Sequence, residues 1–101
     1  MFDIKFNNQE NFEVLVSGDL DINTVSKFQD KVLEKYKDQD KDLVFNLENL
    51  DYIDSTGLGA IVRVYKEVSD KGHKVKVLNA KKNIKKLFLI TELDSLMDLG
   101  E

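Results

Sequence analysis

The chain has 101 residues, a length that suits one domain with one hydrophobic core. Apolar residues make up 42% and charged residues 34% of it, which is the balance of a folded globular protein. The net charge of −4 argues against binding to nucleic acid, and no apolar run is long enough to cross a membrane. The lack of cysteine excludes disulfides, and the first residues show no secretory signal. We therefore expect a cytoplasmic protein with a single domain over residues 1–101.

Two segments near the amino terminus have the period of half-buried β-strands. Apolar and polar residues alternate in MFDIKF and again in NFEVLVSG, and turn-forming residues stand between these segments. The simplest arrangement for two such neighbours is an antiparallel hairpin.

A helix is predicted next, because the apolar period lengthens to three and four residues from Ile22 onward. Asp21 or Asn23 is available as its N-cap, and the helix should end in the charged stretch 37–42. The segment from Leu43 to Leu47 is a short apolar run, typical of a central strand that is covered on both faces.

The second half of the chain continues the alternation of strands and helices. A second helix is predicted beyond Thr56, with Gly72 as the left-handed residue after its end. HKVKVLNA predicts another strand, NIKKLFLI a third helix, and the residues from Thr91 onward only a short element. This order predicts an α/β sandwich with a mixed sheet of four to five strands and about three helices.

Side chains that could form a catalytic or metal site are few. His73 is the only histidine, and without cysteine the usual set of nucleophile, base and orienting residue cannot be built. A metal site would depend on carboxylates alone, those of Asp19, Asp21, Asp51 and Asp54, and such loop residues commonly cap helices instead. We expect no enzyme activity, no cofactor and no metal.

The stretch DYIDSTGLGAIV, from Asp51, opens with four residues of loop chemistry and continues as a helix. Asp54 or Ser55 can cap this helix, while Gly57 and Gly59 permit a tight turn and close packing against the sheet. Ser55 is expected at the carboxyl end of a strand, where open α/β sheets place ligands and partners and where an enzyme could phosphorylate it. The N–H groups of the first helical turn would favour a phosphate, and the neighbouring carboxylates would oppose it.

These residues carry a resemblance to a known family. DSTGLG after a strand ending in FNLENL, with the turn GDLD at residues 18–21, is similar to the signature of the bacterial anti-sigma factor antagonists. These are small members of the sulfate transporter and anti-sigma factor antagonist (STAS) domain family. Residues 83–94 resemble the family's penultimate helix and the turn after it. Family members commonly continue through another strand and helix, and we expect this last helix to be absent or reduced to a turn after Met97.

The resemblance implies transcription regulation by partner switching. Ser55 is implied as the residue phosphorylated by a partner that is both a serine kinase and an anti-sigma factor. Unphosphorylated antagonist would bind this kinase and free the sigma factor, phosphorylated antagonist would release it, and a serine phosphatase would reset the cycle. The implied partner-binding residues are Asp21, Asp54, Ser55, Thr56, Gly57 and Leu58. We expect the free protein to be a monomer.

Two other functions stay open at this point. A STAS domain could be a scaffold subunit of a transport or stress-signalling complex, with the serine loop used for docking alone. A receiver domain would take the phosphate on Asp51 or Asp54, but the acidic pair expected after its first strand is missing.

Overall fold

The amino-terminal segments form the predicted antiparallel hairpin. In the computed structural model, which describes residues 1–100, β1 (Asp3–Asn8) pairs with β2 (Phe12–Leu20) so that Ile4 lies opposite Val16. Buried residues of β2 alternate with half-buried ones, because successive side chains of a strand point to opposite faces of the sheet.

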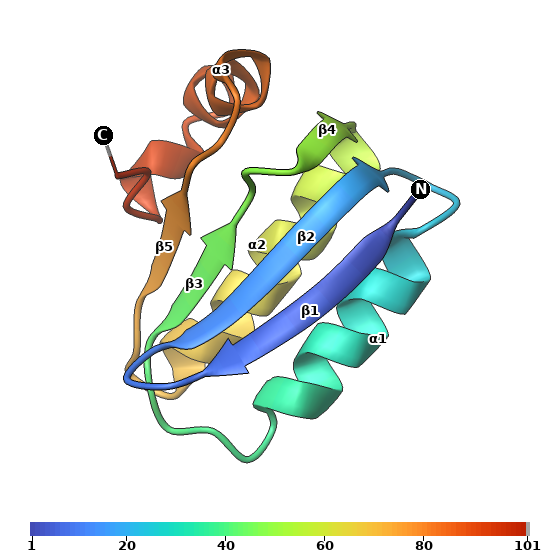
Figure 1. Ribbon diagram of the computed structural model, residues 1–101. Helices are drawn as coiled ribbons and strands as arrows, with labels where there is room; N and C mark the ends of the chain where they lie inside the picture. The colour runs from blue at the N-terminus through green and yellow to red at the C-terminus, as the bar shows by residue number, and fades with distance from the viewer. Residues whose placement is uncertain (101) are drawn as a thin grey trace.

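Three more strands extend the sheet, all parallel to β2 or to its neighbour. β3 (Leu43–Asn46) pairs with the first part of β2, and β5 (Val75–Leu78) lies on the outer side of β3. β4 (Leu50–Ile53) pairs with the last residues of β2 (Figure 1). The result is a mixed five-stranded sheet, which confirms the predicted α/β fold.

The loop predicted for the first four residues of DYIDSTGLGAIV is wrong, because Asp51, Tyr52 and Ile53 belong to β4. Leu50 and Ile53 are buried, whereas Asp51 and Tyr52 between them are exposed. This spacing of three between the buried residues does not have the period of two that identifies a strand in a sequence.

Three α-helices are present, as predicted. They are α1 (Val25–Tyr36), α2 (Ser55–Asp70) and α3 (Lys82–Ile90), followed by the short 3-10 helix η1 (Leu93–Ser95). Figure 1 shows α1 and α2 against one face of the sheet and α3 beyond the β5 edge. After η1, Asp98 forms a single parallel bridge with Lys76 of β5, and no further helix follows within the described residues.

The hydrophobic core lies between the sheet and the pair α1 and α2. Phe28 of α1 and Phe45 of β3 are fully buried, with their ring centroids 5.9 Å apart. Val64 and Val68 of α2 are also fully buried. Burial of each such side chain stabilises the fold by about 1.5–3 kcal/mol, so packing against the sheet is what holds these amphipathic helices in place.

The start of α1 differs from the prediction. The helix begins at Val25 rather than Ile22, and its N-cap is Thr24, whose side chain makes no capping hydrogen bond. The carbonyl oxygen of Asp21 accepts hydrogen bonds from the N–H groups of Thr24 and Val25, which closes a turn ahead of the helix. Neither Asp21 nor Asn23 therefore serves as the N-cap. Ile22 lies in this turn and is 73% exposed.

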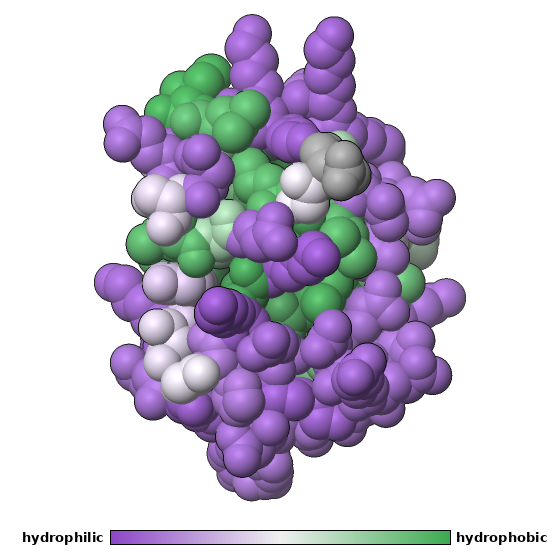
Figure 2. Space-filling view, turned by 90° about the vertical axis from the view of Figure 1, so that its left-hand side faces the viewer, coloured by the Kyte–Doolittle hydropathy of each residue, from purple (hydrophilic) through white to green (hydrophobic). Residues whose placement is uncertain are grey.

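Figure 2 shows apolar side chains among hydrophilic ones on the side of the molecule where β5, α3 and the C-terminal segment lie. The exposed large apolar residues of this part of the chain are Leu89, Ile90 and Leu96.

Within residues 1–100, no helix has the length and apolar character that a membrane crossing requires.

Candidate functional site

The predicted site residues gather where β2 and β4 end side by side. Leu20 of β2 is the register partner of Ile53 of β4, and the N–H of Asp54 lies 3.4 Å from the carbonyl oxygen of Leu20. Because the two strands are parallel, the turn after β2 and the start of α2 leave the sheet at the same end (Figure 1). Asp21 and Asp54 each stand one residue beyond this pair, so the structure brings the GDLD turn and the DSTGLG segment together.

Asp54 is the N-cap of α2, which confirms one of the two predicted alternatives, Asp54 or Ser55. Its backbone is extended, with φ −113° and ψ −173°, and its Oδ1 accepts a hydrogen bond of 3.0 Å from the N–H of Gly57. A carboxylate at this position satisfies a free N–H group and interacts favourably with the positive end of the helix dipole. Since Asp54 caps the helix, the hydroxyl of Ser55 is not needed for this purpose.

Ser55 and Thr56 are the first residues of α2, and both are exposed. Within residues 1–100 neither hydroxyl has a hydrogen-bond partner. Ser55 is therefore exposed at a capped helix start, where a visiting enzyme could reach it.

Gly57 and Leu58 have a different place in the site, because both are buried. A Cβ atom at Gly57 would lie 2.5 Å from the carbonyl oxygen of Leu20, which confirms the predicted close packing at this glycine. Leu58 is only 8% exposed and belongs to the core. Their part in partner binding stays a prediction, and their burial shows that both help to position the start of α2 against the sheet.

The same prediction is wrong for Gly59, which is exposed. A Cβ atom there would meet nothing within 4 Å, so Gly59 is not required for packing against the sheet. The sequence pattern of two nearby glycines does not distinguish the one that faces the sheet from the one that faces away.

Side chains order the turn between β2 and α1. The Oδ1 atom of Asp21 accepts a hydrogen bond of 2.9 Å from the N–H of Asn23. The N–H of Asp21 donates to the hydroxyl of Thr24 at 3.0 Å, and that hydroxyl donates to the carbonyl oxygen of Asp19 at 2.8 Å. Asp21 thus has a structural role in the turn, in addition to its predicted place near Ser55.

Four carboxylates, those of Asp19, Asp21, Asp51 and Asp54, lie at this end of the sheet, and the positive charge of the amino terminus acts on Asp51. Within residues 1–100, no lysine or arginine forms an ion pair with Asp19, Asp21 or Asp54. Asp51 is different, because its Oδ1 accepts a hydrogen bond of 2.5 Å from Nζ of Lys81. This bond, together with the lysine's positive charge, lowers the pKa of Asp51. Ser55 therefore lies in an acidic neighbourhood that is only partly compensated.

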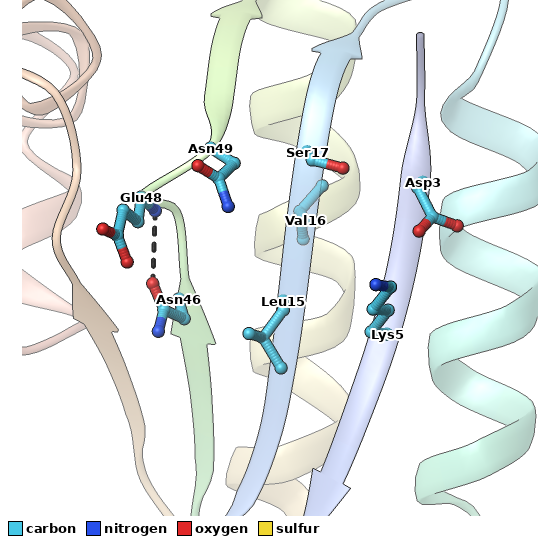
Figure 3. Close-up of a pocket in the computed structure, with 8 residues that line it drawn as sticks. All are labelled: Asp3, Lys5, Leu15, Val16, Ser17, Asn46, Glu48 and Asn49. Atoms are coloured by element: carbon cyan, nitrogen blue, oxygen red, sulfur yellow. Dashed lines mark hydrogen bonds between the residues drawn. The ribbon is translucent and has the colours of Figure 1, made fainter.

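The geometry gives no support to a catalytic or metal site. The described residues contain no cluster of three or more histidine or acidic side chains that could hold a metal ion. A pocket of about 170 Å³ opens where β3 and β4 separate beside β2 (Figure 3). Its lining includes Lys5, Ser17 and Glu48 but no histidine, so it does not contain a nucleophile with a neighbouring imidazole base. Periodicity could not predict this pocket, because it depends on β4 being a separate strand.

Similarity to known proteins shows the family to which this fold belongs. A STAS domain model matches residues 4–101, and the chain belongs to the STAS domain family, with the bacterial anti-sigma factor antagonists. It is 37% identical over 90 residues to an anti-sigma-B factor antagonist of Staphylococcus aureus (strain NCTC 8325 / PS 47). The match covers 89% of this chain and 83% of that relative.

The fold is shared with solved structures, of which two serve as examples. An anti-sigma factor antagonist from Mycobacterium paratuberculosis superposes with a TM-score of 0.84 at 19% identity, covering 96% of this chain and 83% of that one. The Bacillus cell fate determinant SpoIIAA in its phosphorylated form gives a TM-score of 0.71 at 22% identity, covering 100% of this chain and 93% of that one.

Proposed function

We propose that this protein is an anti-sigma factor antagonist whose binding is switched by phosphorylation of Ser55. The observation that carries the proposal is the exposed, unbonded hydroxyl of Ser55 on a helix start that Asp54 caps. The 37% identity to an anti-sigma-B factor antagonist supports the regulatory class, and the existence of a phosphorylated fold relative supports the type of modification.

In the proposed cycle the unphosphorylated protein binds an anti-sigma factor that is also a serine kinase, and the sigma factor is released. The kinase transfers the γ-phosphoryl group of ATP to Oγ of Ser55: the new O–P bond forms as ADP leaves, and the hydroxyl proton passes to a base of the kinase. A serine phosphatase restores the hydroxyl. The cycle takes place in the cytoplasm, the free protein is a monomer, and the protein itself is a regulator rather than an enzyme.

Electrostatics can account for release without refolding. A phosphate adds about −1.5 to −2 charges to Ser55. After transfer it faces the phosphates of the ADP that the kinase still holds, and a like-charge contact near 4 Å costs roughly 1 kcal/mol in water and about 4 kcal/mol at a protein surface. Because about 1.4 kcal/mol is tenfold in affinity, one or two such contacts move the complex from bound to largely free.

The fold can tolerate this modification locally. Ser55 is exposed and its hydroxyl holds no other residue within the described chain, so a phosphate displaces no core contact. We expect the amide spectra of the free phosphorylated and unphosphorylated proteins to differ only near Ser55 and the turn after β2. A rearrangement throughout the sheet would contradict a local switch.

The test is the intact mass of the protein after incubation with the candidate kinase and Mg-ATP. We expect one phosphate on the wild type and on Thr56→Ala, the matched neighbour, and none on Ser55→Ala. The phosphate should survive acid, which distinguishes phosphoserine from an acyl phosphate on Asp51 or Asp54. No modification of the wild type by a kinase that is active on another substrate would overturn the proposal and favour a STAS scaffold.

Binding to the kinase gives a second test of the same proposal. We expect Ser55→Ala to bind the kinase as the wild type does and Ser55→Asp to bind at least tenfold more weakly, because only the second variant adds charge. Equal affinities of the two variants would show that negative charge at position 55 does not weaken binding to the kinase.

A further inference from the structure

The turn between β2 and α1, at the same end of the sheet as Ser55, presents a large apolar side chain to solvent. Ile22 is 73% exposed, although full burial of an isoleucine is worth about 1.5–3 kcal/mol to a fold. Ile22 comes two residues after Leu20, and Ser55 comes two residues after Ile53. Leu20 and Ile53 are register partners in the sheet. The turn after β2 and the start of α2 therefore lie at the same end of the sheet (Figure 1), and Ile22 belongs to the first and Ser55 to the second.

We propose that Ile22 is the apolar anchor with which this protein docks onto the serine kinase that modifies Ser55. This inference rests on the proposed function. It assigns to the kinase an apolar pocket that receives Ile22, bordered by basic side chains.

The turn holds Ile22 outward through hydrogen bonds on both sides of it. Residues before and after Ile22 are joined by the bond from the N–H of Asn23 to Oδ1 of Asp21 and by the bond from the Thr24 hydroxyl to the carbonyl of Asp19. Isoleucine is also stiff at χ1, because it branches at Cβ. An anchor that is already ordered loses little conformational entropy on binding, so more of its burial energy appears as affinity.

The charge around Ile22 points to the chemistry of the partner. Asp19 and Asp21 flank the turn, and neither pairs with a lysine or arginine within residues 1–100. A central apolar residue in a polar, charged surround is the usual arrangement of an interaction hot spot. A basic border on the kinase would complement these carboxylates and speed association at low salt.

The chain offers a matched control for the anchor. Ile90 is also an exposed isoleucine, at 64%, and it is the last residue of α3, a helix that contributes no residue to the turn after β2 or to the DSTGLG segment. Ile22→Ala and Ile90→Ala remove the same atoms from exposed positions, so both variants should fold with the stability of the wild type.

The experiment measures Kd for the kinase and the KM for Ser55 phosphorylation with the wild type and the two variants. We expect Ile22→Ala to raise Kd and KM about tenfold or more with little change in kcat, and Ile90→Ala to behave as the wild type. If the wild type is not phosphorylated at all, the proposed function fails. If the wild type is phosphorylated and Ile22→Ala has an unchanged Kd and KM, only the anchor is overturned.

Asp19→Asn tests the border of the proposed pocket separately. We expect this variant to associate with the kinase severalfold more slowly at low salt, and the difference to shrink as salt screens the charges. An association rate that does not change with Asp19→Asn or with salt would overturn the basic border.

Discussion

Gly57 of α2 lies so close to Leu20 of β2 that a Cβ atom at position 57 would be 2.5 Å from the Leu20 carbonyl oxygen. A methyl group cannot occupy this space unless the backbone of one element moves. We therefore expect Gly57→Ala to lower the free energy of unfolding by about 1–3 kcal/mol, because overpacking outweighs the gain in helix propensity. Urea denaturation measures this change, and an unchanged or increased stability would show that α2 shifts at no cost.

Gly59 provides the opposite prediction from the same helix. A Cβ atom at this exposed position would meet nothing within 4 Å, and glycine is a poor residue in a helix interior. We expect Gly59→Ala to raise the free energy of unfolding by about 0.5–1 kcal/mol in the same urea experiment. A loss of stability would mean that the start of α2 is strained in a way that the contacts of Gly59 do not show.

The sequence predicts much of this fold because its longer elements have clear periods. The alternation in β2, the helical spacing in α2 and the left-handed position of Gly72, with φ +81°, all follow the patterns in the sequence. The DSTGLG segment likewise predicts a cap by Asp54 or Ser55, of which the structure uses Asp54, and an exposed start of α2, since both features depend on residues close together in the chain.

The remaining features depend on contacts between distant segments. β4 buries only Leu50 and Ile53, and it is a strand because the end of β2 lies beside it. Ile22 has the spacing of a helical core residue, but hydrogen bonds within the turn keep it outside the helix, which begins only at Val25. Such competition between local turns and helix propagation is decided by side-chain hydrogen bonds that periodicity does not register.

Lys71 joins the carboxyl end of α1 to the end of α2. Its Nζ donates hydrogen bonds to the carbonyl oxygens of Tyr36, Lys37 and Gln39 at 3.1, 2.7 and 2.8 Å. It also lies 4.6 Å from the centroid of the Tyr36 ring. A positive charge at a helix carboxyl end satisfies free carbonyl groups and interacts favourably with the dipole.

We expect Lys71→Met, which keeps the length of the side chain, to lower the free energy of unfolding by about 1–2 kcal/mol. Lys66→Met, at an exposed lysine of the same helix, is the control and should change stability by less than about 0.5 kcal/mol. Thermal and urea unfolding both report the difference. Equal effects of the two substitutions would show that the three hydrogen bonds of Lys71 add nothing to stability.

His73 lies between two carboxylates at the opposite end of the strands from Ser55. Its Nε2 is 2.6 Å from Oδ1 of Asp40, and its Nδ1 is 3.2 Å from Oδ1 of Asp42. The hydrogen bond with Asp40 is the largest effect on the pKa of His73. Desolvation opposes it, but the bond with Asp42 and the charges of both carboxylates add to it, so the pKa is raised above its ordinary value of 6.5. The imidazolium form is therefore favoured in the folded protein.

This raised pKa predicts a pH dependence of stability. Because the folded protein binds the proton more tightly than the unfolded chain, the stabilisation is fully present below about pH 6.5 and is lost as the pH rises through the higher pKa of the folded state.

His73 is the only histidine, so its NMR titration is free of overlap. We expect the pKa of His73 to lie above 6.5 in the wild type and to be lower in Asp40→Asn. The fall in the free energy of unfolding with rising pH, which the wild type should show, should be absent from His73→Gln. Asp40 is the better choice for this test, because Asp42 also accepts a hydrogen bond from the N–H of Lys74 and its replacement would disturb the backbone. A wild-type pKa at or below 6.5 would mean that the two carboxylates do not hold the proton on His73 in solution.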